Sequence, residues 1–180
     1  NTAVGSEALS SITTGGNNVA IGRRAGYVIQ GGDNNTAIGS LSGDAITTGS
    51  QCTAVGHQAL TANQTGSYIT AIGNNALTAC TASENTAVGW DAGGSIVGGA
   101  SNVMIGSNAG DTLTSGNSNT CLGDSSDVSA TGSTNQTAIG FATIAHADNS
   151  VTLGNASVDD VYMAQDGAAE VHCGTLAVGL

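Results

Sequence analysis

A short phrase that ends in glycine returns along this chain at a nearly constant spacing. The steps between its glycines are 17 residues, except for one of 16 and a last one of 14. A repeat of this length cannot bury a core alone, whereas coils stacked on one another can. The period therefore predicts an all-β parallel roll, or solenoid, of about ten coils over residues 1–154. The repeating glycines are Gly5, Gly22, Gly39, Gly56, Gly73, Gly89, Gly106, Gly123, Gly140 and Gly154.

The three residues before each glycine are typical of a short strand. Thr or Val comes first, usually Ala second, and a branched aliphatic third, as in Thr36, Ala37 and Ile38. Successive side chains of a strand point to opposite faces, so the first and third share a face and the second takes the other. We expect the aliphatic column to fill the roll and the alanines to face a surface that approaches closely. A small residue three places after the glycine, and an apolar residue seven places after it in most repeats, lead us to expect a second short strand in each coil.

Asparagine recurs four residues before the glycine in six of the coils. Stacked amides of this kind form hydrogen-bonded ladders in repetitive β structures, so we interpret the column as structural. A row of amides that bind a sugar is the alternative. The column comprises Asn1, Asn18, Asn35, Asn85, Asn102 and Asn119.

The amino-acid composition limits the classes of partner that the chain is expected to bind. The 180 residues include 28 Gly, no Pro and only two basic residues, and the net charge is −11. Binding to phosphate backbones or anionic membranes needs basic patches, so nucleic acid and membrane are not expected partners. The chain has no apolar run of about 18 residues that would span a membrane.

The phrases NTAVG, NVAIG and NTAIG and the TTG loops resemble two related groups. These are the heads of trimeric autotransporter adhesins and, more closely, the tail fibres of bacteriophages. The resemblance implies a left-handed parallel β-roll assembled as a homotrimer, followed by a short β-rich shaft over residues 155–180. It also implies an extracellular location, on a virion tail fibre or a bacterial surface. The residues that would pack at the trimer axis are Ala3, Ala20, Ala37, Ala54, Ala71, Ala87 and Ala138.

The position after the glycine is the most variable near the strand and holds the only Trp and Phe of the chain. We expect Trp90, His57 and Phe141 to be candidates for ligand binding, because aromatic rings offer large contact areas to sugars. The competing interpretation is that the aromatic rings cover seams between subunits.

The sequence offers little support for catalysis or metal binding. Cys52, Cys80, Cys121 and Cys173 occupy different columns, so we expect free thiols. The three histidines lie apart, and no metal site, cofactor or catalytic residue is expected. The chain is interpreted as a non-enzymatic structural and adhesion protein, a trimeric rod that attaches to a cell-surface glycan or receptor. The alternatives are a tailspike that cleaves polysaccharide and an ice-binding solenoid.

Overall fold

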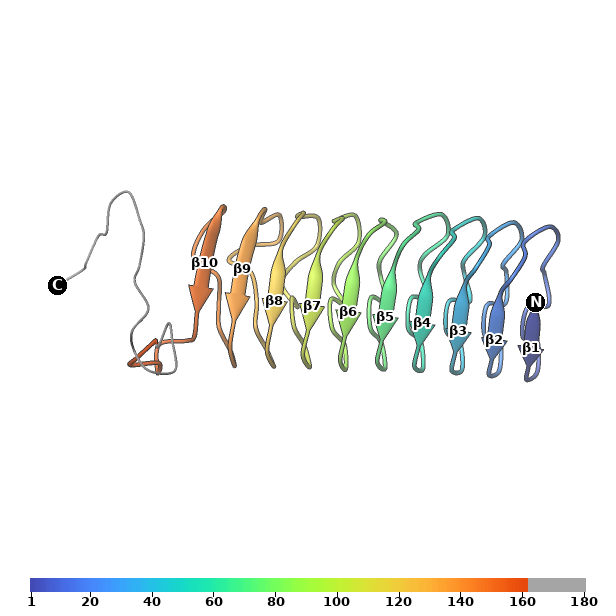
Figure 1. Cartoon of the computed structure of the whole chain (residues 1–180), viewed down its shortest axis with the longest axis horizontal. Helices are drawn as coiled ribbons and strands as arrows, with labels where there is room; N and C mark the ends of the chain where they lie inside the picture. Colours follow the sequence, from blue (N-terminus) through green and yellow to red (C-terminus); the bar gives the residue numbers. More distant parts are fainter. Residues whose placement is uncertain (162–180) are drawn as a thin grey trace, which may run out of the picture.

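The computed structural model describes residues 1–161, and these form one long parallel sheet with the rest of each coil behind it (Figure 1). Neighbours along the chain are neighbours in the sheet. The strands are β1 (Thr2–Val4), β2 (Val19–Ile21), β3 (Thr36–Ile38), β4 (Thr53–Val55), β5 (Thr70–Ile72), β6 (Thr86–Val88), β7 (Val103–Ile105), β8 (Thr120–Leu122), β9 (Gln136–Ile139) and β10 (Ser150–Leu153). The predicted parallel solenoid with a spacing of about 17 residues is confirmed.

The register follows the sequence repeat. Ala20 pairs with Ala37, and Ala37 pairs with Ala54, so equivalent residues stack from one strand to the next. The shorter step between β5 and β6 keeps this register, because Ala71 pairs with Ala87. Ten strands in this order are separated by nine coils, close to the ten expected.

The predicted second strand is wrong. Within residues 1–161 each coil has one strand, and the segment after the glycine is a series of turns. In the coils of β1 to β7, residues two and four places beyond the glycine have left-handed backbones, as in Gln58 and Leu60 with φ of 56° and 57°. This alternation prevents an extended chain, but the segment still bonds to the next coil, since the Leu60 N–H donates to the Ala76 carbonyl oxygen at 3.0 Å.

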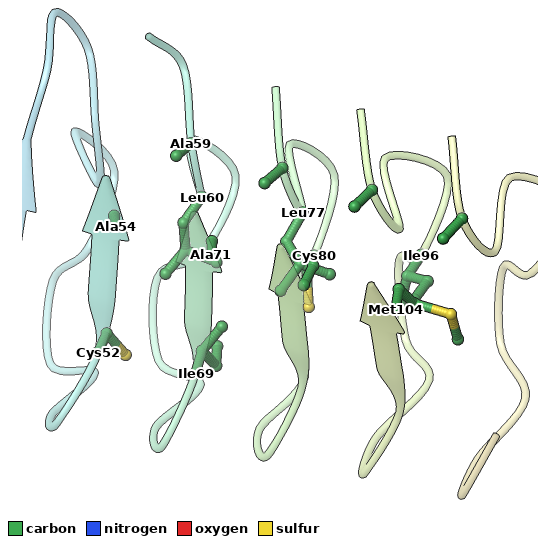
Figure 2. Close-up of a cluster of buried hydrophobic side chains, with 14 of the residues drawn as sticks. Cys52, Ala54, Ala59, Leu60, Ile69, Ala71, Leu77, Cys80, Ile96 and Met104 are labelled. Carbon is green, nitrogen blue, oxygen red and sulfur yellow. The ribbon is translucent and has the colours of Figure 1, made fainter. Parts of the chain in front are cut away.

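The core is thin, and most coils bury small residues around one larger side chain (Figure 2). The larger side chain comes from one of two positions. Where the fourth residue after the repeating glycine is Leu, the seventh is small or polar in the inner coils. Where the fourth is Gly, the seventh is Ile or Leu. The inner pairs are Gly26 with Ile29, Gly43 with Ile46, Leu60 with Asn63, Leu77 with Cys80, Gly93 with Ile96 and Gly110 with Leu113.

Met104 interrupts the alanine column, and glycines in the neighbouring coils compensate for the volume of its side chain. Its side chain is fully buried, and its Cγ lies 3.5 Å from where a Cβ on Gly93 would stand. A Cβ on Gly110 would collide with the Met104 sulfur. Two glycines in adjoining coils therefore leave the space that this longer side chain fills.

The asparagine column forms a ladder that satisfies buried backbone groups. Asn18 Oδ1 accepts a hydrogen bond from the Asn35 N–H at 2.8 Å, and Asn18 Nδ2 donates to the Gly32 carbonyl oxygen at 2.8 Å. Asn85, Asn102 and Asn119 continue the pattern with amide-to-amide bonds of 3.1 Å. These amides are buried and fully used, so they do not form an exposed row that could bind a sugar.

One coil exchanges the positions of its amide and its aliphatic side chain. Ile69 stands in the asparagine column and is buried, while Asn63 occupies the position that is Ile46 in the preceding coil. Asn63 Nδ2 donates to the Gly66 carbonyl oxygen and Asn63 Oδ1 accepts from the Gly66 N–H, both at 2.9 Å. The corner therefore keeps a buried amide although the column is interrupted.

The repeating glycine is required by close stacking. Gly22 has φ of 132°, and a Cβ there would lie 2.6 Å from the Gly39 carbonyl oxygen of the next coil. No side chain fits this position without moving the coils apart.

The predicted shaft is only partly within the described residues. Residues 155–161 contain a turn and no strand. The remainder of the segment, 162–180, lies outside the described residues.

Candidate functional site

The outer face of the sheet carries a column of exposed apolar side chains that runs along the described coils. We define the outer sheet face as the first and third residues of each strand triplet, which point away from the core. Its aliphatic column is between 37% and 56% exposed at eight positions. The aliphatic column is Val4, Ile21, Ile38, Val55, Ile72, Val88, Ile105, Leu122, Ile139 and Leu153. The neighbouring column is Thr2, Val19, Thr36, Thr53, Thr70, Thr86, Val103, Thr120, Thr137 and Val151.

The two sides of the strands are therefore the reverse of those expected. Ala20, Ala37 and Ala54 are fully buried inside a single chain, as are Ala71, Ala87 and Ala138. They have no surface to offer a second chain, so their predicted packing at a trimer axis is wrong. Ala3 is exposed in this structure, where its strand β1 is the first of the sheet and pairs with β2. The physical reason is the narrow interior, which admits a methyl group beneath the strand but not a branched chain.

The outer sheet face is also uncharged. Both of its columns contain only Thr and aliphatic residues, although the chain has a net charge of −11. Acidic residues of the described coils, such as Glu7, Asp44 and Asp91, stand on the turns. Large exposed arrays without charge are typical of interaction surfaces, which makes the outer sheet face the first candidate site.

The three predicted ligand-binding residues are exposed but not gathered into one pocket. His57, Trp90 and Phe141 each follow a repeating glycine, at the corner after β4, β6 and β9 respectively. Trp90 is 53% exposed and Phe141 is 69% exposed. His57 and Trp90 are two coils apart, and Phe141 lies three coils beyond Trp90.

Trp90 lies in a row of mostly polar residues whose side chains make no hydrogen bonds within residues 1–161. We define the central corner strip as the two residues after the glycine in the coils of β4 to β7. Every hydrogen bond that these residues make within residues 1–161 runs through their main chain. For example, the Asp91 N–H donates to the Asn74 carbonyl oxygen and the Asn108 N–H donates to the Trp90 carbonyl oxygen, both at 2.9 Å. The strip is His57, Gln58, Asn74, Asn75, Trp90, Asp91, Ser107 and Asn108.

The surroundings of Phe141 are different. The Ser125 hydroxyl donates to Asp124 Oδ1 at 2.8 Å, and Asn155 Nδ2 donates to the Phe141 carbonyl oxygen at 2.8 Å. Asn155 Oδ1 accepts from the Ser157 N–H. The polar side chains around Phe141 are therefore already engaged, and its coil offers Ala142 where the coil of Trp90 offers Asp91.

Charged groups near the amino-terminal end of the same corner are tied to one another. The Arg24 guanidinium lies 3.7 Å from Glu7 Oε2 and 3.9 Å from Asp44 Oδ2, in the coils on either side. It also covers the Tyr27 ring at 4.4 Å from the centroid. Burial raises the pKa of Asp44, and the Arg24 charge opposes that effect. We interpret the two contacts of Arg24 with Glu7 and Asp44 as ion pairs that hold three consecutive coils together.

A shallow hollow near the end of the roll brings Ser129, His146 and Asp148 to one rim. Asp148 Oδ1 accepts hydrogen bonds from the Thr134 N–H and from Gln136 Nε2, both at 2.9 Å, and these hold its pKa below the usual range. Cleavage of a glycosidic bond needs two carboxyl groups across the scissile bond. This rim supplies a single carboxyl group, that of Asp148, which is already hydrogen-bonded to Thr134 and Gln136.

A second side-chain ladder was missed by the sequence reasoning. At the corner before the asparagine column, the backbone N–H of most coils donates to a side-chain oxygen of the next coil. Asp33, Ser50 and Ser67 accept from Gly16, Asp33 and Ser50 at 2.6 Å, 3.0 Å and 3.1 Å. The signal in the sequence was the recurrence of Ser, Asp or Asn six residues before the repeating glycine, which Gly16, Ala100 and Thr134 interrupt.

The structure also gives the positions of the cysteines and of possible metal ligands. Cys52, Cys80 and Cys121 are buried free thiols, as expected, and Cys173 lies outside the described residues. In residues 1–161 no group of three His, Cys, Asp or Glu side chains gathers as metal ligands do. The same residues include no helix with the length and apolarity needed to cross a membrane.

Comparison with protein-family models, with curated proteins and with solved structures finds no match to the chain.

Proposed function

We propose that this chain is the rod of a surface fibre, in which three copies associate through the outer sheet face and hold an attachment surface away from its base. The observation that carries the proposal is the exposed aliphatic column, which runs the whole length of the sheet without one charged residue. Burial of apolar surface is the main favourable term in such association, at about 25 cal/mol per Å².

The repeat itself supports association in register. Equivalent side chains of the outer sheet face recur at every strand, so two copies placed side by side meet the same surface at every coil. The number three and the location on a virion or bacterial surface rest on the resemblance of the repeat phrase to trimeric fibres and adhesins.

The test is the molecular mass in solution, measured by light scattering on the wild type and on two variants. The wild type is expected at the mass of three chains, where one chain is 17.3 kDa. Ile72→Asp combined with Ile105→Asp places carboxylates on the outer sheet face and is expected to give monomers. Val97→Asp is the matched control, because Val97 is 51% exposed but lies on a turn away from that face. A wild-type monomer, or an unchanged mass in the double variant, would overturn the proposal.

A second candidate, an ice-binding surface, is favoured by the same face. Threonines of seven strands and the aliphatic methyl groups point outward together from one in-register sheet. Ice binding needs this face free in a single chain. A monomer with thermal hysteresis would select this candidate, whereas a trimer without it would reject it.

A further inference from the structure

The central corner strip combines two features that sugar-binding surfaces use. An exposed aromatic ring supplies a flat face, and amides and a carboxylate beside it supply hydrogen-bonding groups. Asn74 and Asn108 stand on the coils before and after Trp90, and Asp91 follows it directly. None of these side chains makes a hydrogen bond within residues 1–161, in contrast to the buried asparagine ladder, whose amides bond to the next coil.

We propose that Trp90 and its neighbours Asn74, Asp91 and Asn108 form a binding site for a neutral oligosaccharide of pyranose units. One pyranose ring stacks its apolar C–H face on the indole, and its hydroxyl groups bond to the flanking amides and the carboxylate. The inference rests on the attachment role proposed above, and it names the ligand class and the residues of that role. It does not depend on how many copies assemble.

The charge of the chain favours neutral sugars over acidic ones. The net charge is −11, and residues 53–110, which contain the strip, include no Lys or Arg. A sulfated or uronic-acid polysaccharide would meet Asp91 with no cation near it. A neutral sugar has hydroxyl groups that donate to this carboxylate and accept from the amides.

Phe141 provides an internal comparison. It occupies the same column and is more exposed than Trp90. Its polar neighbours are engaged within the fold, as Asp124 and Asn155 show. Exposure of an aromatic ring alone therefore does not single out Trp90, whereas the free polar groups around it do.

The chain contains a single Trp, so tryptophan fluorescence, excited where the three tyrosines do not absorb, reports on this site alone. The experiment titrates the protein with cellotetraose, chitotetraose and lactose, and with a sulfated heparin tetrasaccharide as the acidic comparison. At least one neutral probe is expected to shift the emission with saturation, and the acidic probe is not.

Calorimetry with the bound probe then compares three variants, and light scattering gives the mass of each. Trp90→Ala is expected to abolish binding without changing the mass. Asn74→Ala is expected to weaken binding about fivefold, the value of one hydrogen bond of about 1 kcal/mol. Phe141→Ala is the matched control and is expected to bind as the wild type does.

The outcomes separate this inference from the proposed rod. A wild type at the mass of three chains that binds none of the neutral probes would overturn the site and leave the rod. A Trp90→Ala variant of lower mass would identify Trp90 as a residue of the subunit seam and would also overturn the site. A wild-type monomer that binds a neutral probe through Trp90 would support the site and reject the trimer.

Discussion

Cys52, Cys80 and Cys121 lie inside the roll, and burial raises the pKa of each thiol. The effect is largest for Cys121, where burial and then the Asp127 charge raise the pKa to about 12. In the unfolded chain the same thiol loses its proton near 9.0. Between these values the unfolded chain releases a proton that the folded chain keeps, so rising pH favours unfolding.

The stability of the roll is therefore expected to be insensitive to these thiols below pH 9 and to fall above it. For Cys121 alone the loss is about 1 kcal/mol for each pH unit between pH 9 and pH 12. Urea unfolding of the wild type and of Cys121→Ala at pH 8, 9, 10 and 10.5 measures it. The variant is expected to be less stable at pH 8 and to lose less stability between pH 9 and pH 10.5. Parallel curves for the two proteins would refute this account of Cys121.

At the scale of the single coil, one large side chain fills the interior, and two positions compete to supply it. Gly43 and Ile46 represent one solution and Leu77 with Cys80 the other. A Cβ on Gly43 would already lie 2.9 Å from Ile46 Cδ1, so adding Leu there overfills the coil. The left-handed backbone at Gly43 is not an obstacle, because Leu60 and Leu77 adopt φ of 57° and 50° at the equivalent position.

A double-mutant cycle at Gly43 and Ile46 tests this exchange of volume. Ile46→Ala is expected to cost 2 to 4 kcal/mol, roughly the range for emptying a buried aliphatic site. Gly43→Leu is expected to cost about 1 to 3 kcal/mol through overpacking. The double variant is expected to be at least about 2 kcal/mol more stable than the sum of the two costs predicts. Denaturant unfolding of all four proteins gives the coupling, and simple additivity would show that the two sites do not share one space.

Sequence reasoning predicted the period, the strands and the asparagine ladder because each depends on one residue recurring in one column. It placed the aliphatic column inside because alternation states that Ala37 and Ile38 face opposite ways and does not state which way is inward. That choice depends on the width of the coil, which is set by the left-handed turns at positions such as Gln58 and Leu60. The exchange of Asn63 with Ile69 could not be predicted for a similar reason. Each residue breaks the pattern of its own column, and the two changes compensate for each other only because the residues are neighbours in space.

At the scale of the whole molecule, the distribution of charge predicts how association responds to salt. The chain has 13 acidic and two basic residues, and the outer sheet face has none of either. Copies that meet through this face bury apolar surface while their acidic turns approach one another. The attraction is therefore hydrophobic and independent of salt, whereas the opposing repulsion is screened, since the Debye length falls from roughly 30 Å at 0.01 M to about 8 Å at 0.15 M.

Raising the salt concentration from about 10 mM to about 150 mM is accordingly expected to strengthen association, so that the assembly persists to lower protein concentration. Sedimentation velocity over a dilution series at the two salt concentrations measures the shift. The Ile72→Asp and Ile105→Asp double variant serves as the control and is expected to remain monomeric at both. Weaker association in high salt would mean that ion pairs between turns hold the copies together, and the outer sheet face would then be free for another partner.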